Sequence, residues 1–496
     1  MKKIVLPVLT FVATVLSGCE DFLSVESPDK ITSESFWRNQ SDAESGLAAA
    51  YSQLEFSTGT WSFAEIKWPV EAYREDMMVI GRDAANYEDW VQLYDFTYTD
   101  ANTQLAEYWR INYTGLNYCN QVISRVADID MDATFRSQII NEAVFLRAYY
   151  HMKLLLNWDK IVLREEYINS AEQLDQPLSE RADCWKSIIR DFKEATNLPA
   201  SQPAEHIGRA TSGAAWAYLG WAYLTRAYEQ PANKEADLNA AVDAFNHVAG
   251  YSLENDFLGM FNGTNENSHE SIFELQFTLD RNNGANYYTE LQFWIAAEEI
   301  GGWDEIAPAD KLVNEFKKEG KTSGSGGYDE RMYATLIFDD KYFYSGNKIF
   351  SHNYDYFFKT ERRSVFRKLL PDYANIDDEE SGYNIPLMRY SNVLLMKAEA
   401  LNQLNKTSEA IPLVNQVREV HGGMPPMTGS SYDDVKAQIE HERILEFPLE
   451  NFRFYDLRRW GKAKEALESV GRTNFDPAEN NFFPIPRKEL NSNNAL

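Results

Sequence analysis

The chain is poor in cysteine and in positive charge. Its 496 residues include 3 cysteines, and 48 Lys and Arg residues stand against 76 Asp and Glu residues, which gives a formal net charge of −28. Three cysteines are too few for a disulfide framework. The acidic balance excludes nucleic acid as a partner, because nucleic-acid binding depends on clustered cations that neutralise phosphates. Anionic membrane surfaces would also repel such a chain.

Long hydrophobic runs are also missing, apart from one short run near the N-terminus. Lys2 and Lys3 precede thirteen mostly apolar residues, 4–16. This is the layout of a secretory signal, and it is shorter than the roughly 18 apolar residues of a membrane-spanning helix. We predict that residues 1–18 are removed, which leaves Cys19 at the new N-terminus. The alternative is an ordinary signal peptide in which Cys19 is incidental.

The remaining two cysteines, Cys119 and Cys184, would then reach an oxidising compartment, where a bridge between them is possible. We expect them instead to be buried and unpaired. Residues 19–35 are polar and contain Pro28, and we expect them to form a tether before a single domain at 36–496.

Helical patterns dominate that domain, and strand signals are few and short. Ser41 and Glu44 have the spacing of a capping box, and apolar residues follow them at helical intervals. In residues 139–158, apolar side chains cover most of the helix circumference, which is typical of a helix packed between others. We therefore predict a mainly α fold.

Two segments resemble tetratricopeptide helix pairs. Residues 216–228, WAYLGWAYLTRAY, have the W-x2-L-G-x2-Y spacing of a first helix, and Ala241 and Phe245 supply the A-x3-F of the second. Small Gly220 would allow the paired helix to approach closely. A second copy is found in residues 389–423. The pattern predicts tetratricopeptide-like helix pairs.

These helices are expected at about 41–250 and 386–465. Between them, at about 255–384, we predict a long irregular loop-rich insert, because this segment is rich in Asn, Gly, Asp and aromatic residues. Long loops on a rigid helical scaffold are often functional, so the insert is expected to form a ligand face.

Catalytic and metal-binding motifs occur only as near misses. HERIL at His441 lacks the second histidine of a zinc protease. Glu315 stands five residues before the GKT that begins at Gly320, where a P-loop needs its first glycine. Residues 128–133 begin like a calcium loop but lack its turn glycine. The seven histidines show no pair at ligand spacing, and we expect each at the surface or at a cap. The motifs predict no catalytic residue, metal or cofactor, although 76 acids leave a glycosidase carboxylate pair open.

Residues 441–463 read HERILEFPLENFRFYDLRRWGKA, which contains the pattern ER-x-x-E-F-x-x-E-x-x-R-x-x-D-L-R-R-W-G. This pattern resembles the signature of the SusD/RagB family of outer-membrane nutrient-binding lipoproteins, also described as starch-utilisation-system D-like. Residues 483–496 are similar to its terminal IP-x-x-E-x-x-x-NP-x-L, although Asn494 stands where proline is usual. Weaker matches follow the family order at 34–54, 142–158, 208–224 and 307–316, the last with Ala309 in place of threonine. The LSGC sequence before Glu20 and Asp21 resembles a lipobox with a Bacteroidetes surface-export signal.

The resemblance implies a helical fold on tetratricopeptide-like pairs and acylation of Cys19. It implies a lipid-anchored protein at the outer membrane, exposed on the cell surface and attached to the membrane through that lipid only. It also implies a partner, a TonB-dependent transporter of the SusC type, over whose mouth the lipoprotein closes as a lid. For the charged signature itself, we expect ion pairs that lock a helix and the turn at Pro448 into the bundle.

Aromatic residues carry the functional prediction. The faces of Trp and Tyr rings are electron-rich and pack on the C–H groups of sugars, while nearby polar side chains bind the hydroxyls. In the family, ligand contacts come mainly from the segment after the first helices and from the insert. The residues of these regions that we expect to bind a glycan are Trp61, Tyr87, Asn286, Tyr287, Tyr288, Trp294 and Trp303. Trp303 has an alternative role, since it can close the turn before Pro308.

Together these features predict a non-enzymatic surface lipoprotein that captures an oligosaccharide or polysaccharide and delivers it to the transporter. Two alternatives remain open. One is a peptide-binding adaptor that uses the tetratricopeptide-like groove near residues 216–223, and the other is a lipoprotein glycosidase.

Overall fold

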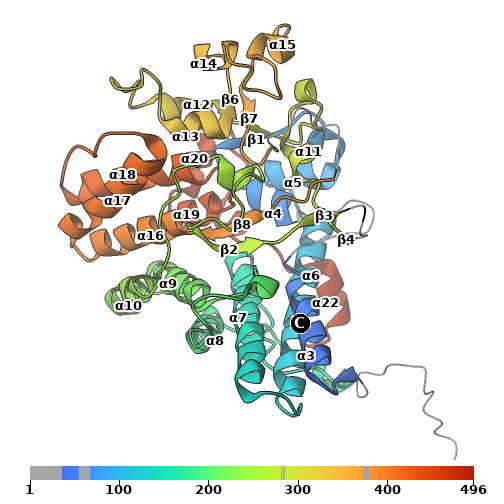
Figure 1. Ribbon diagram of the computed structural model, residues 1–496. Coiled ribbons are helices and arrows are strands. Elements are labelled where there is room, and N and C mark those ends of the chain that lie inside the picture. Colours follow the sequence, from blue (N-terminus) through green and yellow to red (C-terminus); the bar gives the residue numbers. More distant parts are fainter. Residues whose placement is uncertain (1–35, 55–66, 281, 283–284, 372–379) are drawn as a thin grey trace, which may run out of the picture.

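The computed structural model describes residues 36–54, 67–280, 282, 285–371 and 380–496, and it confirms the predicted mainly α-helical fold (Figure 1). The long helices before the insert are α3 (Gln40–Tyr51), α6 (Thr103–Val126), α7 (Ala133–Asn157), α8 (Arg181–Ala195), α9 (Ser212–Glu229) and α10 (Lys234–Asn246). The long helices after it are α16 (Tyr390–Gln403), α17 (Thr407–Gly422) and α18 (Tyr432–Glu446), and they are followed by the short helices α19 (Arg453–Arg459), α20 (Ala463–Glu468), α21 (Pro477–Asn480) and α22 (Arg487–Ser492).

The other short elements lie between the long helices and within the insert. The short helices are α4 (Lys67–Ala72), α5 (Glu88–Asp95), α11 (Leu291–Ile295), α12 (Asp310–Lys317), α13 (Glu330–Thr335), α14 (Lys341–Tyr344) and α15 (Tyr354–Phe358). The 3-10 turns are η2 (Ala84–Asn86), η3 (Ala171–Gln173), η4 (Ala204–His206), η5 (Pro231–Asn233), η6 (Gly259–Phe261) and η7 (Glu298–Ile300). The strands are β1 (Met78–Ile80), β2 (Ser271–Leu275), β3 (Thr278–Asp280), β4 (Ala285–Tyr287), β5 (Ile306–Pro308), β6 (Leu336–Ile337), β7 (Val365–Phe366) and β8 (Ile385–Arg389).

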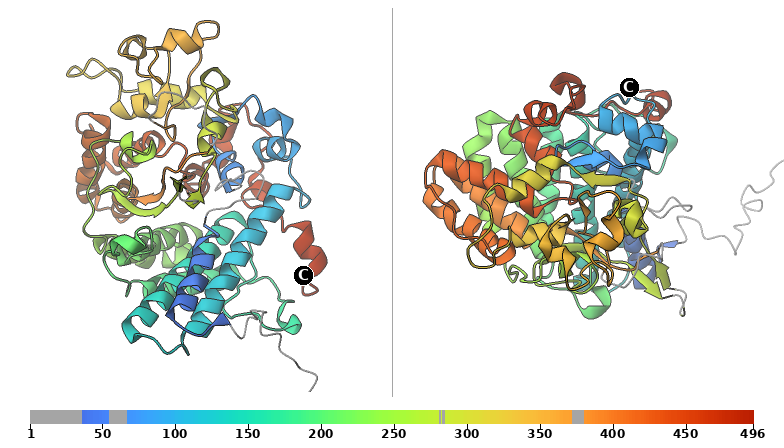
Figure 2. Two further views of the ribbon diagram at one scale, coloured as in Figure 1. Left: turned by 45° about the vertical axis from the view of Figure 1, so that its right-hand side comes forward. Right: turned by 90° about the horizontal axis from the view of Figure 1, so that it is seen from above.

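The helices form a continuous stack in which each packs against the next from α6 to α10. Helix α10 then contacts α16, so the stack continues through α17 and α18 although the insert separates the two parts in sequence. Figures 1 and 2 show α3, α6 and α7 side by side at one end of the molecule and most of the insert, in yellow, at the other. Among the described residues, no helix has both the length and the apolar character needed to cross a bilayer.

The first predicted tetratricopeptide pair is formed by α9 and α10. A Cβ atom added to Gly220 would lie 2.3 Å from Cε1 of Phe245, which is far inside van der Waals contact. Glycine is therefore required for α10 to lie this close to α9. The predicted relation between Gly220 and the phenylalanine of the second helix is confirmed.

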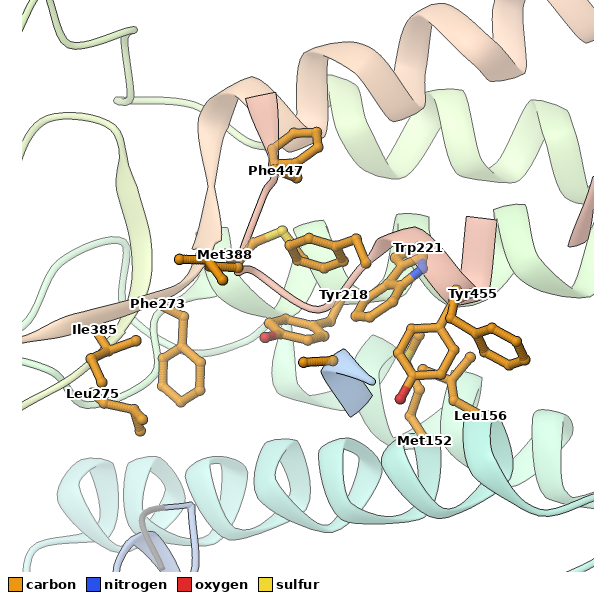
Figure 3. Close-up of a cluster of buried hydrophobic side chains, with 14 of the residues drawn as sticks. Met152, Leu156, Tyr218, Trp221, Phe273, Leu275, Ile385, Met388, Phe447 and Tyr455 are labelled. Carbon is orange, nitrogen blue, oxygen red and sulfur yellow. The ribbon is translucent and has the colours of Figure 1, made fainter. Parts of the chain in front are cut away.

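Packing between the stack and the insert centres on α9. Tyr218 and Trp221 of α9 lie in a cluster with Phe273 of β2 and Met388 of β8 (Figure 3). Because large aromatic side chains contribute much of the apolar area removed from water, this cluster attaches the insert firmly to the helices.

The insert is more regular than expected. Strand β2, near its start, pairs antiparallel with β8 at its end, with Leu275 opposite Ile385. Strand β5, from its middle, pairs with β1 from the N-terminal part, with Val79 opposite Ala307. Backbone pairing needs no apolar periodicity. These short ladders can therefore form in a segment that looks irregular and polar in the sequence.

Two smaller predictions can also be compared with the structure. Helix α3 is capped by Asn39, whose side chain accepts a hydrogen bond from the Asp42 amide at 3.1 Å. The predicted capping box at Ser41 is therefore wrong, since Asn39 is an equally good N-cap and starts the helix earlier. Cys119 and Cys184 are both buried and unpaired, as predicted.

The charged C-terminal signature forms a buried ion-pair network, as expected. Arg443 bonds to Asp456 at 2.6 Å, and Glu446 bonds to Arg389 at 2.8 Å and to Arg331 at 3.1 Å. These pairs join α18 to β8, α13 and α19. Buried pairs of this kind are costly to break singly, so the signature is structural.

Histidines are part of this network, and the expectation that all seven lie at the surface or at caps is wrong. His421 is buried between Glu270 and Glu446, each 2.9 Å from one ring nitrogen. These two carboxylates raise the pKa of His421 to about 9 despite the opposing effect of burial. His441 is bonded in the same way by Glu315 and Glu319.

Although each of these two histidines lies in a cluster with carboxylates that could hold a metal ion, each ring nitrogen already faces a different carboxylate. The geometry is that of ion pairs.

Candidate functional site

Four aromatic side chains form a row that runs from the surface into the insert. The ring of Tyr87 lies 4.9 Å from that of Trp90, the Trp90 ring lies 4.2 Å from that of Trp294, and Trp303 meets Trp294 edge-on at 5.8 Å. We call these four residues the aromatic row. Tyr87 is 46% exposed, whereas Trp90 is 5% and Trp294 8% exposed, so the row presents Tyr87 to solvent on a buried indole support.

Backbone pairing places the row. Tyr87 and Trp90 lie at the start of α5, shortly after β1, and Trp294 belongs to α11, shortly before β5. The Glu305 amide donates to the Trp294 carbonyl at 2.9 Å, and the Gly81 amide donates to the Glu305 carbonyl at 2.8 Å. The β1–β5 ladder therefore brings α5 and α11 together.

Gly81 is needed at this junction. A Cβ atom there would lie 1.8 Å from the Asp304 carbonyl oxygen. No side chain fits in that space, so glycine allows the chain after β1 to lie this close to residues 304–305.

Charged groups surround the inner end of the row. The Arg363 guanidinium bonds to Glu299 at 3.0 Å and to Asp304 at 2.7 Å, so these two carboxylates are occupied as ion pairs. Burial, together with the charges of Asp83 and Asp304, raises the pKa of Glu305 to about 8. Burial and the charges of Glu305 and Asp83 also raise the pKa of Tyr87.

A hollow of about 530 Å³ lies beside the β3–β4 hairpin. Its walls are one face of α3, residues 206–209, residues 274–276 and the ring of Tyr287. Tyr287 is 43% exposed and stacks on Phe277 at 6.0 Å. Arg209 is held at its edge by Glu142 at 2.7 Å. The hollow combines apolar side chains with a few polar groups, as small-molecule sites do.

The structure brings some of the predicted site residues together and separates others. Tyr87, Trp294 and Trp303 meet in the aromatic row, and Tyr287 lines the hollow at α3 instead. Tyr288 is half-buried next to it. Of the remaining candidates, Asn286 lies in β4 opposite Leu279, and Trp61 and Cys19 lie outside the described residues.

The central member of the row, Trp90, was missed in the sequence. Tyr87 and Trp90 are three residues apart, which places both on one side of the first turn of α5. That spacing was the available signal. Trp90 was hidden because its partner Trp294 is distant in sequence. Trp303 lies half-buried at the turn, where its amide donates to the Phe293 carbonyl at 2.7 Å, so it closes the turn as well as ending the row.

Comparison with known proteins places the chain in one family. A family model described as the SusD family matches residues 269–496, and one described as starch-binding associating with outer membrane matches residues 21–224. SusD-like protein P2 of Formosa agariphila is 26% identical over 523 residues, covering 98% of each chain.

Solved structures agree with this fold. A SusD superfamily protein from Bacteroides vulgatus has a TM-score of 0.78 at 25% identity, covering 92% of this chain and 98% of its own. Surface glycan-binding protein A from Bacteroides thetaiotaomicron, solved in complex with laminarihexaose, has a TM-score of 0.73 at 20% identity, covering 92% and 98%. A laminarin binding SusD-like protein has a TM-score of 0.73 at 22% identity, covering the same shares. With matches to both halves of the chain and over its whole length, the protein belongs to the SusD/RagB family.

Proposed function

We propose that this protein is a non-enzymatic glycan-binding lipoprotein of the outer membrane, anchored through Cys19 and exposed on the cell surface. It captures an oligosaccharide or polysaccharide and passes it to a TonB-dependent transporter of the SusC type. The observation that carries the proposal is the exposed Tyr87 ring on its support of Trp90 and Trp294. An aromatic face with flanking hydrogen-bonding groups binds a sugar ring without a catalytic group.

Three further observations support a saccharide ligand. Tyr287 offers a second exposed aromatic face at the hollow beside α3. Two structural neighbours are described as binding laminarin or as holding laminarihexaose, and one matching family model is described as starch-binding. Glucans are therefore the first ligands to test.

Binding is expected to be weak for each site, in the micromolar to millimolar range, or about 4 to 8 kcal/mol. A receptor that hands its ligand on must release it readily. Several weak contacts along one polymer chain can offset this weakness through avidity.

The test is affinity electrophoresis and calorimetry of the soluble body, beginning at Glu20, against plant, fungal, bacterial and host polysaccharides, with laminarin and starch first. We expect a saturable isotherm for at least one polysaccharide and at least tenfold weaker binding for Tyr87→Ala. Tyr356→Ala is the matched control, because Tyr356 is 64% exposed on α15, outside the row and the α3 hollow.

Other outcomes would contradict the proposal. If Tyr87→Ala still binds the polysaccharide as the wild type does, the aromatic row is not part of the glycan site. A lack of binding to every polysaccharide, together with capture of a peptide that depends on residues 216–223, would favour the adaptor. Release of shortened sugars from a polysaccharide would identify a glycosidase.

A further inference from the structure

A larger hollow, of about 860 Å³, lies within the insert between residues 255–258, α13 and α14. Figure 1 shows α13 and α14 on the upper part of the molecule, away from α3. The hollow shares no lining residue with the aromatic row or with the hollow at α3. Its size falls within the roughly 300–1,000 Å³ of small-molecule sites.

Three tyrosines form its wall. The rings of Tyr333 and Tyr342 lie 4.6 Å apart, and the Tyr328 amide donates to the Tyr333 hydroxyl at 3.1 Å. The floor is made by Phe257 and His421, whose rings are 5.1 Å apart. Buried carboxylates on both sides hold the His421 ring in its position in this floor.

The hollow also carries three cations, which are Lys341, Lys348 and Arg367. Within the described part of the chain, none of them has a carboxylate at ion-pair distance. The Lys348 ammonium lies 3.4 Å from the Tyr342 ring centroid, and the Arg367 guanidinium donates to the carbonyls of Tyr333 at 2.8 Å and of Lys348 at 3.4 Å. In a chain with a net charge of −28, three cations without a carboxylate partner in one hollow stand out.

The acids that line the same hollow do not neutralise these cations directly. Asp340 is bonded to Lys321 at 3.2 Å and to the Tyr342 amide at 2.9 Å. Asp256 accepts from the Gly259 amide at 3.0 Å, and Glu330 is exposed to solvent. The cations therefore remain available to an anionic group of a ligand.

We propose that this hollow is a second saccharide site, selective for sugars that carry a carboxylate or a sulfate ester. The half-buried rings of Tyr328 and Tyr342 would pack on the sugar C–H groups, with the buried ring of Tyr333 as their support. Lys341 and Lys348 would pair with the anionic group. This site is separate from the aromatic row, so its existence does not depend on the function proposed for the row.

The test is calorimetry of the soluble body at low salt with three probes. Trigalacturonate carries carboxylates, a κ-carrageenan tetrasaccharide carries sulfate esters, and maltotriose is the neutral control. We expect one or both acidic probes to bind, with at least tenfold weaker binding in the Lys341→Gln/Lys348→Gln double variant. Binding should also weaken as salt is raised, because the cations are partly exposed. The acidic probe that binds identifies which anionic group the site takes.

The matched control is Lys186→Gln/Lys193→Gln on α8, which removes the same charge from exposed positions outside the hollow. The control variant should bind the acidic probe as tightly as the wild type does. Tyr87→Ala should also bind this probe with unchanged affinity. The proposal is overturned if neither acidic probe binds, if maltotriose binds as tightly as they do, or if the control variant loses binding equally. Loss of the acidic probe in Tyr87→Ala would assign the binding to the aromatic row and would also overturn a second site.

Discussion

The indole rings of Trp90 and Trp294 lie with their centroids 4.2 Å apart and their planes at 32°. This contact joins α5, from the N-terminal part, to α11 of the insert, and both rings are almost fully buried. The pair supports the exposed ring of Tyr87 and connects the proposed glycan face to the core.

Replacing Trp90 with alanine should therefore affect both stability and binding. Removing a buried tryptophan costs about 3–5 kcal/mol of unfolding free energy, and Tyr87 would lose its support. Urea unfolding and glycan calorimetry on Trp90→Ala measure the two effects, with Trp90→Phe as the conservative variant that keeps part of the stack. Unchanged stability in Trp90→Ala would show that the stack has no structural role.

The contact between Gly220 and Phe245 leads to a second prediction. Alanine at position 220 would place its Cβ 2.3 Å from the Phe245 ring, so α10 must shift or Phe245 must leave its rotamer. We expect Gly220→Ala to destabilise the fold by about 1–3 kcal/mol, the usual cost of overpacking a core. Combining it with Phe245→Leu should cost less than the sum of the two changes, because the residues share one space.

The control for this comparison is Gly324→Ala. A Cβ at Gly324 meets nothing within 4 Å, so this change should leave the unfolding free energy almost unchanged. Equal effects at positions 220 and 324 would show that α9 and α10 do not require the close approach.

Arg389 is the centre of the buried ion-pair network, and its removal should be costly. Its guanidinium bonds to Glu270 at 2.6 Å, to Glu446 at 2.8 Å and to Glu450 at 2.7 Å. Arg389→Met would leave these buried carboxylates without that partner, which costs about 3–5 kcal/mol. Urea unfolding measures the loss. Arg487→Met is the control, because Arg487 pairs with Asp100 at the exposed surface, where ion pairs contribute little. Similar stabilities for the two variants would contradict the role of the network.

Stability should also depend on pH through two buried glutamates. Burial and the charge of Asp76 raise the pKa of Glu75 to about 8, and burial with the charges of Asp83 and Asp304 does the same for Glu305. In the unfolded chain both carboxyls ionise near 4.5. The folded state therefore binds more protons between about pH 4.5 and 8, and the contribution of these groups to stability is lost as pH rises through that window.

Glu75→Gln and Glu305→Gln should remove this loss, because glutamine stays neutral. Each variant should be more stable than the wild type at pH 9 and nearly equal to it at pH 4. Thermal unfolding across this range measures the effect. A wild-type decline that persists unchanged in both variants would assign it to other groups.

Much of the fold could be predicted from the sequence because its signals are local. Helix periodicity depends on residues three and four apart, and the glycine and phenylalanine of the α9–α10 pair have a fixed spacing. Within the C-terminal signature, the pair of Arg443 and Asp456 is close in sequence and could be expected. The partners of Glu446, Arg389 and Arg331, come from distant parts of the chain and could not be named from the sequence. The exact start of a helix could not be predicted either, since Asn39 and Ser41 are both suitable caps.

The candidate site was only partly predictable. The regions and several residues could be named, including Tyr87 and Trp294, but their arrangement could not. Tyr287 looked equivalent to them in the sequence, but it lies outside the aromatic row and lines the hollow at α3. Aromatic residues in polar segments resemble one another in sequence, and only their neighbours in space decide which of them meet at one site.

By itself, the sequence determined the helical class, the tetratricopeptide-like pairing and the family, because these rest on short-range patterns. The tertiary structure decided which distant residues meet. It placed Trp90 against Trp294 through the β1–β5 ladder, and it buried His421 between Glu270 and Glu446. Such contacts depend on the path of the whole chain, and no local pattern specifies a partner that arrives from another part of the fold.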